Sequence, residues 1–151
     1  MSRAQAVVVR GERVLMVHHV EQKSDNWCLP GGHIGPGEPP ADAVLRELAE
    51  ECGVRGRIVR KVSEVNYGPD DNSHTFLVDI GDQSPKLGRD PELAQDGQIL
   101  ADVQWLRLEE ICERDRAFLW SAGLITVEPF GKTVLGWGDD VNTPRGRGAH
   151  A

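Results

Sequence analysis

The chain of 151 residues has the length of one compact domain. Its 17 lysines and arginines against 24 acidic residues give a formal net charge of −7, which argues against nucleic acid as a partner, because backbone binding needs excess cations. Hydrophobic residues at 39% and charged residues at 27% are typical of a folded globular protein. No apolar run is long enough for a membrane span or a signal peptide, so we expect a cytoplasmic protein without membrane contact.

The N-terminal part of the chain is expected to form short strands. Two valine-rich runs, residues 6–9 and 14–17, flank a turn and predict a hairpin. An apolar segment that begins at Trp27 stops at a proline followed by two glycines, which predicts a short strand that ends there. The glycines and prolines of residues 32–40 exclude a helix or a long strand, so a loop of specific conformation should follow.

Helix signals are clear between Pro40 and Cys52. Proline suits the first turn, Asp42 complements the positive helix start, and Gly53 suits the position just after the end. The apolar residues recur at spacings of three and four and form one stripe: Ala41, Val44, Leu45, Leu48 and Cys52. We therefore expect a helix whose apolar stripe packs on the core.

Further strands are expected in the second half of the chain. Residues 56–65 and 74–80 have strand patterns around a turn rich in glycine, proline and asparagine. A polar loop is expected at 81–96, and one more strand at 103–106.

A second helix and a tail complete the expected organisation. The helix should run from residue 108 to about residue 122. Regularity fades after Pro129, so we expect one domain, residues 1–130, and a C-terminal tail, residues 131–151, that is partly docked or flexible. The three cysteines lack CxxC spacing, which predicts reduced packing residues and neither a disulfide framework nor a zinc site.

Three acidic residues share one face of the first helix. Glu47, Glu50 and Glu51 are spaced i, i+3 and i+4, on a face opposite much of the apolar stripe, so their charges repel and favour a nearby cation. Oxygen ligands without a thiol or imidazole select Mg²⁺ or Mn²⁺. Taken alone, such a triplet is more often a solvated helix face, so spacing by itself does not establish a metal site.

A longer pattern surrounds these carboxylates. Over 23 residues, fixed spacing joins Gly32, Glu38, Arg46, Glu47, Leu48, Glu50, Glu51, Gly53 and Val54. This pattern resembles the Nudix box, the signature of the Nudix hydrolase superfamily. The resemblance implies an α/β (α+β) fold, an αβα sandwich with a mixed β-sheet between helices. It also implies hydrolysis of a pyrophosphate bond in a nucleoside diphosphate linked to another group, by in-line attack of water, with Mg²⁺ or Mn²⁺ as cofactor.

The resemblance also implies a role for individual residues. Glu47, Glu50 and Glu51 would be the catalytic carboxylates and metal ligands, and Glu47 is also the candidate base for the attacking water. The carbonyl of Gly32 would lie near the metal, and the glycine pair should let the main chain approach closely. Glu38 and Arg46, which the charges alone already suggest as an ion pair, would brace the loop against the helix.

One more acidic ligand or base is expected outside the box. Asp96, in the loop before the last expected strand, is the first choice, with Glu92 and Glu64 as the other candidates. Each of the three also fits a solvated acid with no special role.

The identity of the substrate stays open at this point. A small nucleotide is expected, either an ADP-ribose-like sugar nucleotide or a nucleoside triphosphate. Pro69 fits the position of a proline in ADP-ribose pyrophosphatases, but a turn is the better explanation. Tyr67 and Trp27 could stack on a base, although aromatics beside strands are more often core residues. His18 and His19 are assigned no role.

Two other functions and a homodimer are also compatible with the sequence. The main alternative is a Nudix-like nucleotide-binding or regulatory module without catalysis, and the complete set of three glutamates argues against it. Isoprenoid diphosphate isomerisation is disfavoured because no additional catalytic cysteine pattern is present. A homodimer is possible, but no segment of the sequence demonstrates one.

Overall fold

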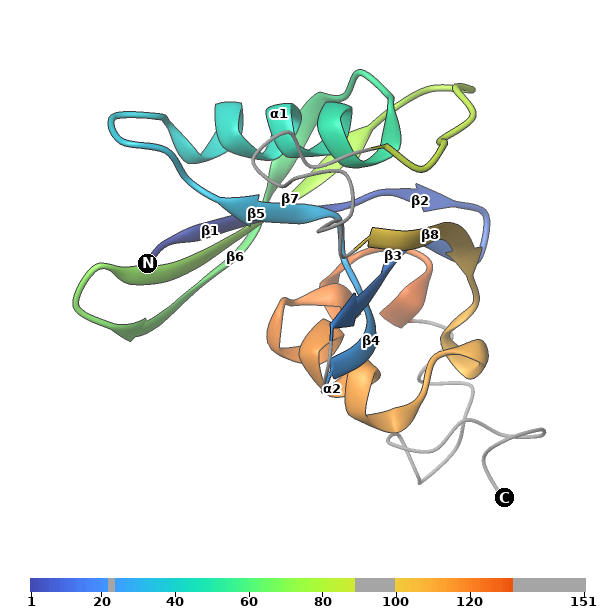
Figure 1. Cartoon of the computed structure of the whole chain (residues 1–151). Helices are drawn as coiled ribbons and strands as arrows, with labels where there is room; N and C mark the ends of the chain where they lie inside the picture. The colour runs from blue at the N-terminus through green and yellow to red at the C-terminus, as the bar shows by residue number, and fades with distance from the viewer. Residues whose placement is uncertain (22–23, 89–99, 132–151) are drawn as a thin grey trace.

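A computed structural model describes residues 1–21, 24–88 and 100–131. Its strands form two sheets (Figure 1). The first sheet has the order β5 (Gly31–His33), β1 (Arg3–Val7), β7 (Asp71–Asp79) and β6 (Arg57–Gly68). β1 runs parallel to β7 and antiparallel to β5, so this sheet is mixed. The second sheet is antiparallel, with β3 (Arg13–Glu21) paired to β2 (Val9–Arg10), β4 (Ser24–Cys28) and β8 (Leu100–Leu106).

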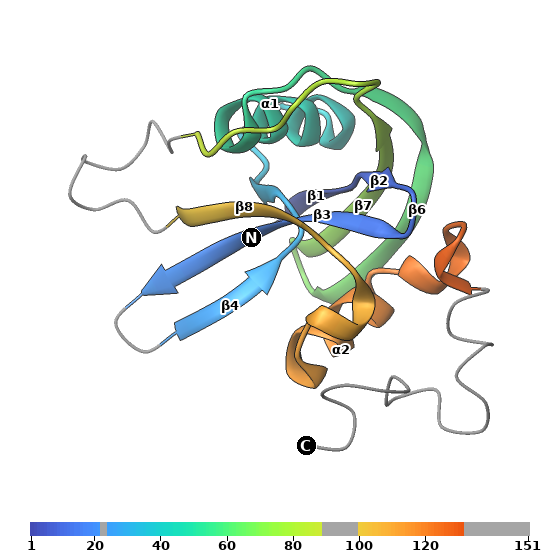
Figure 2. The same cartoon turned by 90° about the vertical axis from the view of Figure 1, so that its right-hand side faces the viewer.

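Helices cover the strands from two sides, as the αβα expectation requires. Figure 2 shows α1 (Pro40–Cys52) on one side and α2 (Glu113–Ser121) on the other. Two 3-10 turns, η2 (Leu108–Glu110) and η3 (Leu124–Thr126), flank α2 in the chain. No helix in the described part of the chain is long and apolar enough to cross a bilayer.

The central strands contribute side chains to two hydrophobic cores, one on each face. In β3, Leu15 and Val17 point into the core beneath α1, whereas Val14 and Met16 point into the core that contains Leu119 of α2. This division follows from the strand geometry, because successive side chains point to opposite faces. The valine-rich sequence of β3 therefore has apolar residues on both faces.

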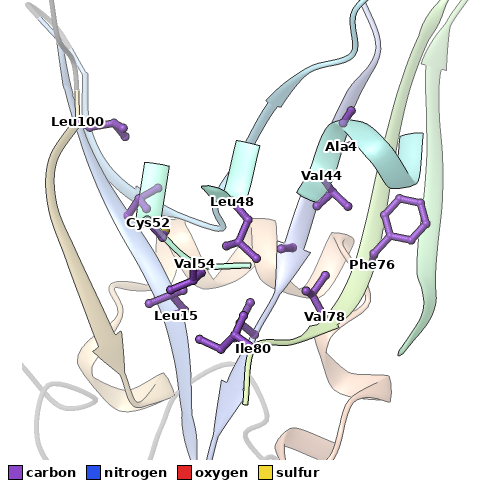
Figure 3. Close-up of a cluster of buried hydrophobic side chains, with 14 residues drawn as sticks. Ala4, Leu15, Val44, Leu48, Cys52, Val54, Phe76, Val78, Ile80 and Leu100 are labelled. Atoms are coloured by element: carbon purple, nitrogen blue, oxygen red, sulfur yellow. The ribbon is translucent and has the colours of Figure 1, made fainter. Parts of the chain in front are cut away.

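The core beneath α1 fixes the position of that helix. Figure 3 shows Val44, Leu48 and Cys52 of α1 close to the side chains of the strands beneath, among them Leu15 and Val78. All five are buried. The expected apolar stripe is therefore confirmed, and its contacts set which side of the helix faces away from the sheet.

The ends of α1 agree with the sequence signals. The helix spans Pro40–Cys52 as expected, and Gly53 ends it in a left-handed conformation with φ of 66°. The loop after β7 adds two bonds to this end: the Lys86 N–H donates to the Cys52 carbonyl at 2.9 Å and the Gly88 N–H to the Glu51 carbonyl at 2.7 Å. Carbonyls that would lack partners at a helix end are thereby satisfied.

The expected N-terminal hairpin is only partly right. Val9 pairs with Val14 across the expected turn, but the strand before it, β1, belongs to the other sheet, where Ala6 pairs with Phe76. The first valine-rich run therefore passes from one sheet to the next near Val8. Its long-range parallel partner has no signature in the local sequence.

Two further boundaries differ from expectation. The segment around Trp27 forms two strands, β4 and β5, and the two glycines lie within β5. The second helix is interrupted, because Ile111 is buried with an extended backbone (φ −98°, ψ 131°). Nη1 of Arg116 donates to the carbonyls of Leu108 and Ile111, which a continuous helix would have used internally.

Of the C-terminal region, the structure describes residues up to 131. Phe130 is fully buried in the core beside α2. The expected tail, residues 131–151, lies almost entirely outside the described residues, so its docking stays a prediction.

Candidate active site

Arg46 is the centre of the polar cluster beside α1. Its Nε and Nη2 bind the two oxygens of Glu38 at 2.8 and 3.0 Å. Its Nη1 donates to Glu47 Oε1 at 3.0 Å and to Glu50 Oε2 at 3.2 Å, and its Nη2 also donates to the His33 carbonyl at 3.0 Å. The guanidinium thus joins three acidic residues and the strand β5 in one network.

Glu38 ties the glycine- and proline-rich loop to the helix. Besides Arg46, its carboxylate accepts the backbone N–H of Gly35 at 2.9 Å. The Arg46 hydrogen bonds, followed by the Gly35 bond, lower the pKa of Glu38 to about 2. The expected Glu38–Arg46 ion pair is therefore present, and it closes the loop over the start of α1.

The two glycines of β5 allow close approaches that a side chain would block. A Cβ added to Gly31 would lie 2.3 Å from the Ala4 carbonyl oxygen on the neighbouring strand β1. A Cβ added to Gly32 would lie 2.6 Å from Glu47 Oε1. The expected close approach of the main chain is confirmed, and it brings Gly32 against the Glu47 carboxylate.

Glu51 differs from the other two glutamates of the helix. Its side chain is buried, with the residue 5% exposed, and its Oε1 accepts the Gly31 N–H at 2.8 Å. The expectation that all three carboxylates share one face away from the apolar stripe is therefore wrong for Glu51. Residue 51 lies three positions after Leu48 and beside Cys52, so it falls at the edge of the buried stripe, and burial is tolerable because the carboxylate is hydrogen-bonded.

Two histidines contact this cluster, although sequence reasoning gave neither of them a role. Nε2 of His19 lies 4.0 Å from Glu51 Oε2. The alternation of Leu15, Val17 and His19 along β3, which places all three toward α1, is the signal that could have found it. His33 follows the glycine pair directly, and its carbonyl binds Arg46.

The candidates for an additional acidic residue have different outcomes. Asp96 and Glu92 lie outside the described residues, so Asp96 stays a prediction. Glu64 is on β6, half-exposed, and forms an ion pair with Lys61 and a contact to His74. Glu64 lines neither of the two cavities that are described below.

The donor set around Gly32 is suited to a hard divalent cation. It consists of the Glu47 and Glu50 carboxylates and main-chain carbonyls, which are oxygen ligands that Mg²⁺ and Mn²⁺ prefer. Among residues 1–21, 24–88 and 100–131, no group of three or more aspartate, glutamate, histidine or cysteine side chains lies close enough together to hold a metal ion. Three carboxylates around one guanidinium nevertheless leave an excess of negative charge at this place.

Two cavities lie near these carboxylates and share one lining residue. We call the first the loop cavity; it measures about 790 Å³ and is lined by Met1, His33, Ile34, Gly35, Pro36, Glu38, Arg46 and Glu50. The second, the central cavity, measures about 560 Å³ and is lined by residues of strands β1, β3, β4, β5, β6 and β7 and of helix α2. His33 lines both, and His19 lines the central cavity. A molecule in the central cavity would therefore lie next to the acidic cluster.

Comparison with known proteins identifies the architecture. The model of the NUDIX domain matches residues 2–126, which include every element described above. The chain belongs to the Nudix family. Its Nudix fold is similar to a NUDIX hydrolase from Nitrosomonas europaea, with a TM-score of 0.62, 20% identity and 77% of each chain covered. This solved structure supports the fold, and the residues matched by the family model include the Nudix box.

Curated relatives of this Nudix chain have diverse names. The human diphosphoinositol polyphosphate phosphohydrolase 3-alpha is 35% identical over 72% of this chain and 65% of its own length. The CMP-5'-(N-acetyl-N-hydroxy-3-aminopropyl)phosphonate hydrolase of Streptomyces rubellomurinus is 34% identical over 73% of this chain and 53% of its own length. The matched regions thus span between about half and two thirds of these relatives.

Proposed function

We propose that this protein hydrolyses a pyrophosphate bond in a nucleoside diphosphate linked to another group, such as an ADP-ribose-like sugar nucleotide or a nucleoside triphosphate. The observation that carries the proposal is the contact of Gly32 with Glu47, while Arg46 holds Glu47 and Glu50 together, inside a complete Nudix box. Membership of the Nudix family supports the reaction class.

The cofactor we propose is Mg²⁺ or Mn²⁺. Glu47, Glu50, Glu51 and the Gly32 carbonyl would hold it, together with Asp96. When bound, the cation offsets the negative charge of the diphosphate and lowers the pKa of a coordinated water. The excess of negative charge around Arg46 favours such a cation and disfavours an anionic substrate without one.

The residues of the chain would divide the remaining work. The Glu47 carboxylate would accept the proton of the attacking water. Arg46 would hold the Glu47 and Glu50 side chains in one arrangement, so that little reorientation is needed when substrate binds. Glu38 would keep Arg46 and the loop in register with α1. Homodimer formation and a cytoplasmic location stay predictions.

The proposal is tested by release of phosphate or nucleoside monophosphate from a nucleotide panel with Mg²⁺. The panel contains ADP-ribose, other sugar nucleotides and nucleoside triphosphates. We expect turnover by the wild type and a loss of about 100-fold or more in kcat for Glu47→Gln and Glu50→Gln, because a general base or charged ligand is removed. Asp42→Asn is the matched control, since it removes an exposed carboxylate from the first turn of the same helix.

Gly32→Ala gives a second, independent variant. The added methyl would meet the end of the Glu47 side chain, which can move at little cost in stability, so we expect lost turnover with a nearly unchanged melting temperature. Wild-type protein that binds nucleotides with Mg²⁺ but hydrolyses none of them would contradict the proposal and would indicate a nucleotide-binding module.

A further inference from the structure

The central cavity has features that bear on the head group of the substrate. Two exposed aromatic residues line it, Tyr67 near the end of β6 and Phe118 in α2. Their exposed fractions are 62% and 63%. The other large apolar residues that are exposed in the described chain, Met1, Val20, Val59, Leu87 and Ile125, do not line this cavity.

The position of these two rings is not explained by the core. Tyr67 and Phe118 are absent from both hydrophobic clusters of the described residues, and their elements lie about 50 positions apart in the chain. An exposed aromatic face beside a cavity is a surface on which a planar ring can stack. Trp27, the other candidate for stacking, already packs its ring on His18, with centroids 4.6 Å apart and planes 9° from parallel.

The charges that line the central cavity limit what can enter it. Among its described lining residues, Arg3 carries the one fixed positive charge, whereas Glu21, Asp71 and Asp115 are acidic. A ring that bears many phosphate groups would need several lysines or arginines to offset its charge. An uncharged planar head group needs none, and Gln5, Asn72 and Ser73 supply polar groups to the same cavity.

We propose that the central cavity binds the nucleobase of the substrate, with Tyr67 and Phe118 as the stacking residues. This inference rests on the proposed function, because it assumes that the diphosphate lies at the neighbouring acidic cluster. Two observations place the central cavity beside that cluster: His33 lines both cavities, and His19, which lines the central cavity, lies 4.0 Å from Glu51. A nucleotide with its base in the central cavity would therefore extend past β5 toward Glu47 and Glu50. The substrate class is then a nucleoside diphosphate derivative and not a densely phosphorylated inositol.

The experiment compares Tyr67→Ala and Phe118→Ala with the ring-retaining variants Tyr67→Phe and Phe118→Tyr. Nucleoside monophosphate binding is measured by calorimetry, and kcat and KM are measured on the best nucleotide of the panel. We expect each alanine variant to raise Kd and KM about tenfold and to leave kcat within about twofold, because base stacking contributes to binding and not to the chemical step. The ring-retaining variants should bind like the wild type.

The control is Ile125→Ala, which removes an exposed apolar side chain outside the cavity and should change neither constant. Wild-type binding by both alanine variants would overturn the inference. Turnover of diphosphoinositol polyphosphate in preference to every nucleotide would overturn it as well, while leaving pyrophosphate hydrolysis intact. Nucleotide binding that depends on Tyr67, without hydrolysis, would support the cavity inference and contradict the proposed function instead.

Discussion

At the scale of single residues, Arg46 shows why an arginine is needed in the box. Its planar guanidinium presents five N–H donors, and the structure uses them on Glu38, Glu47, Glu50 and the His33 carbonyl. A lysine has a single ammonium group and could not hold both Glu38 oxygens and the other partners in a fixed geometry. The neighbouring carboxylates in turn raise the pKa of Arg46, with Glu38 as the largest cause.

The Glu38–Arg46 pair predicts a pH dependence of stability. The folded-state pKa of Glu38, about 2, lies below the ordinary value of 4.5, so the carboxylate binds its proton more weakly in the folded protein. Its stabilising contribution is then complete above about pH 5 and is lost as the pH falls from 4.5 through 2. Denaturant unfolding of wild type and Glu38→Gln between pH 7 and pH 2 should show a difference that shrinks on acidification. A difference that stays constant over that range would contradict this account.

At the scale of elements, α1 links the core to the site. Its apolar stripe packs on the strands, and the same rigid helix carries Glu47 and Glu50 on the other side. The helix ends are fixed as well, by the proline start and by the N–H groups of the loop after β7. Any change that tilts α1 would therefore move the carboxylates relative to Gly32.

Leu48→Ala tests this dependence on packing. Leu48 is fully buried beneath α1, so its truncation should lower the free energy of unfolding by about 2 to 5 kcal/mol. The same substitution at Leu87, which is exposed, should change it by less than about 0.5 kcal/mol. Urea unfolding followed by circular dichroism measures both. Equal effects at the two positions would show that the helix does not depend on this core.

At the scale of the whole molecule, packing places the three cysteines in different environments. Cys52 is buried beneath α1 and Cys28 packs against the same core, whereas Cys112 is exposed just before α2. The expectation that all three are packing residues is therefore wrong for Cys112. Burial, as the largest cause, raises the pKa of Cys28 and of Cys52 to about 12.

These environments predict the reactivity of the thiols. Because the thiolate is the reactive form, Cys28 and Cys52 should stay unmodified by a thiol reagent at pH 8 in the folded protein. One thiol, that of Cys112, should react quickly, and all three should react after unfolding in denaturant. Cys112→Ser is the control and should abolish the fast phase. Rapid reaction of Cys52 in the folded protein would indicate that the core opens readily, whereas rapid reaction of Cys28 would indicate access through the central cavity, which it lines.

The sequence by itself determined the features that depend on near neighbours. The bounds of α1, the pairing of Glu38 with Arg46 and the polar turn around Pro69 follow from spacing, capping residues and backbone preferences within a few positions. The Nudix box added the family and the expected metal chemistry, because its spacing is specific. Local chemistry of this kind acts along the chain and can be recognised there.

Only the tertiary structure decided which distant segments meet. The parallel pairing of β1 with β7, the burial of Glu51 against the Gly31 N–H and the approach of His19 depend on contacts between elements remote in sequence. The same is true of Tyr67 and Phe118, which border one cavity from different elements. Such contacts are set by how two cores pack around shared strands, and a single sequence carries no direct record of that packing.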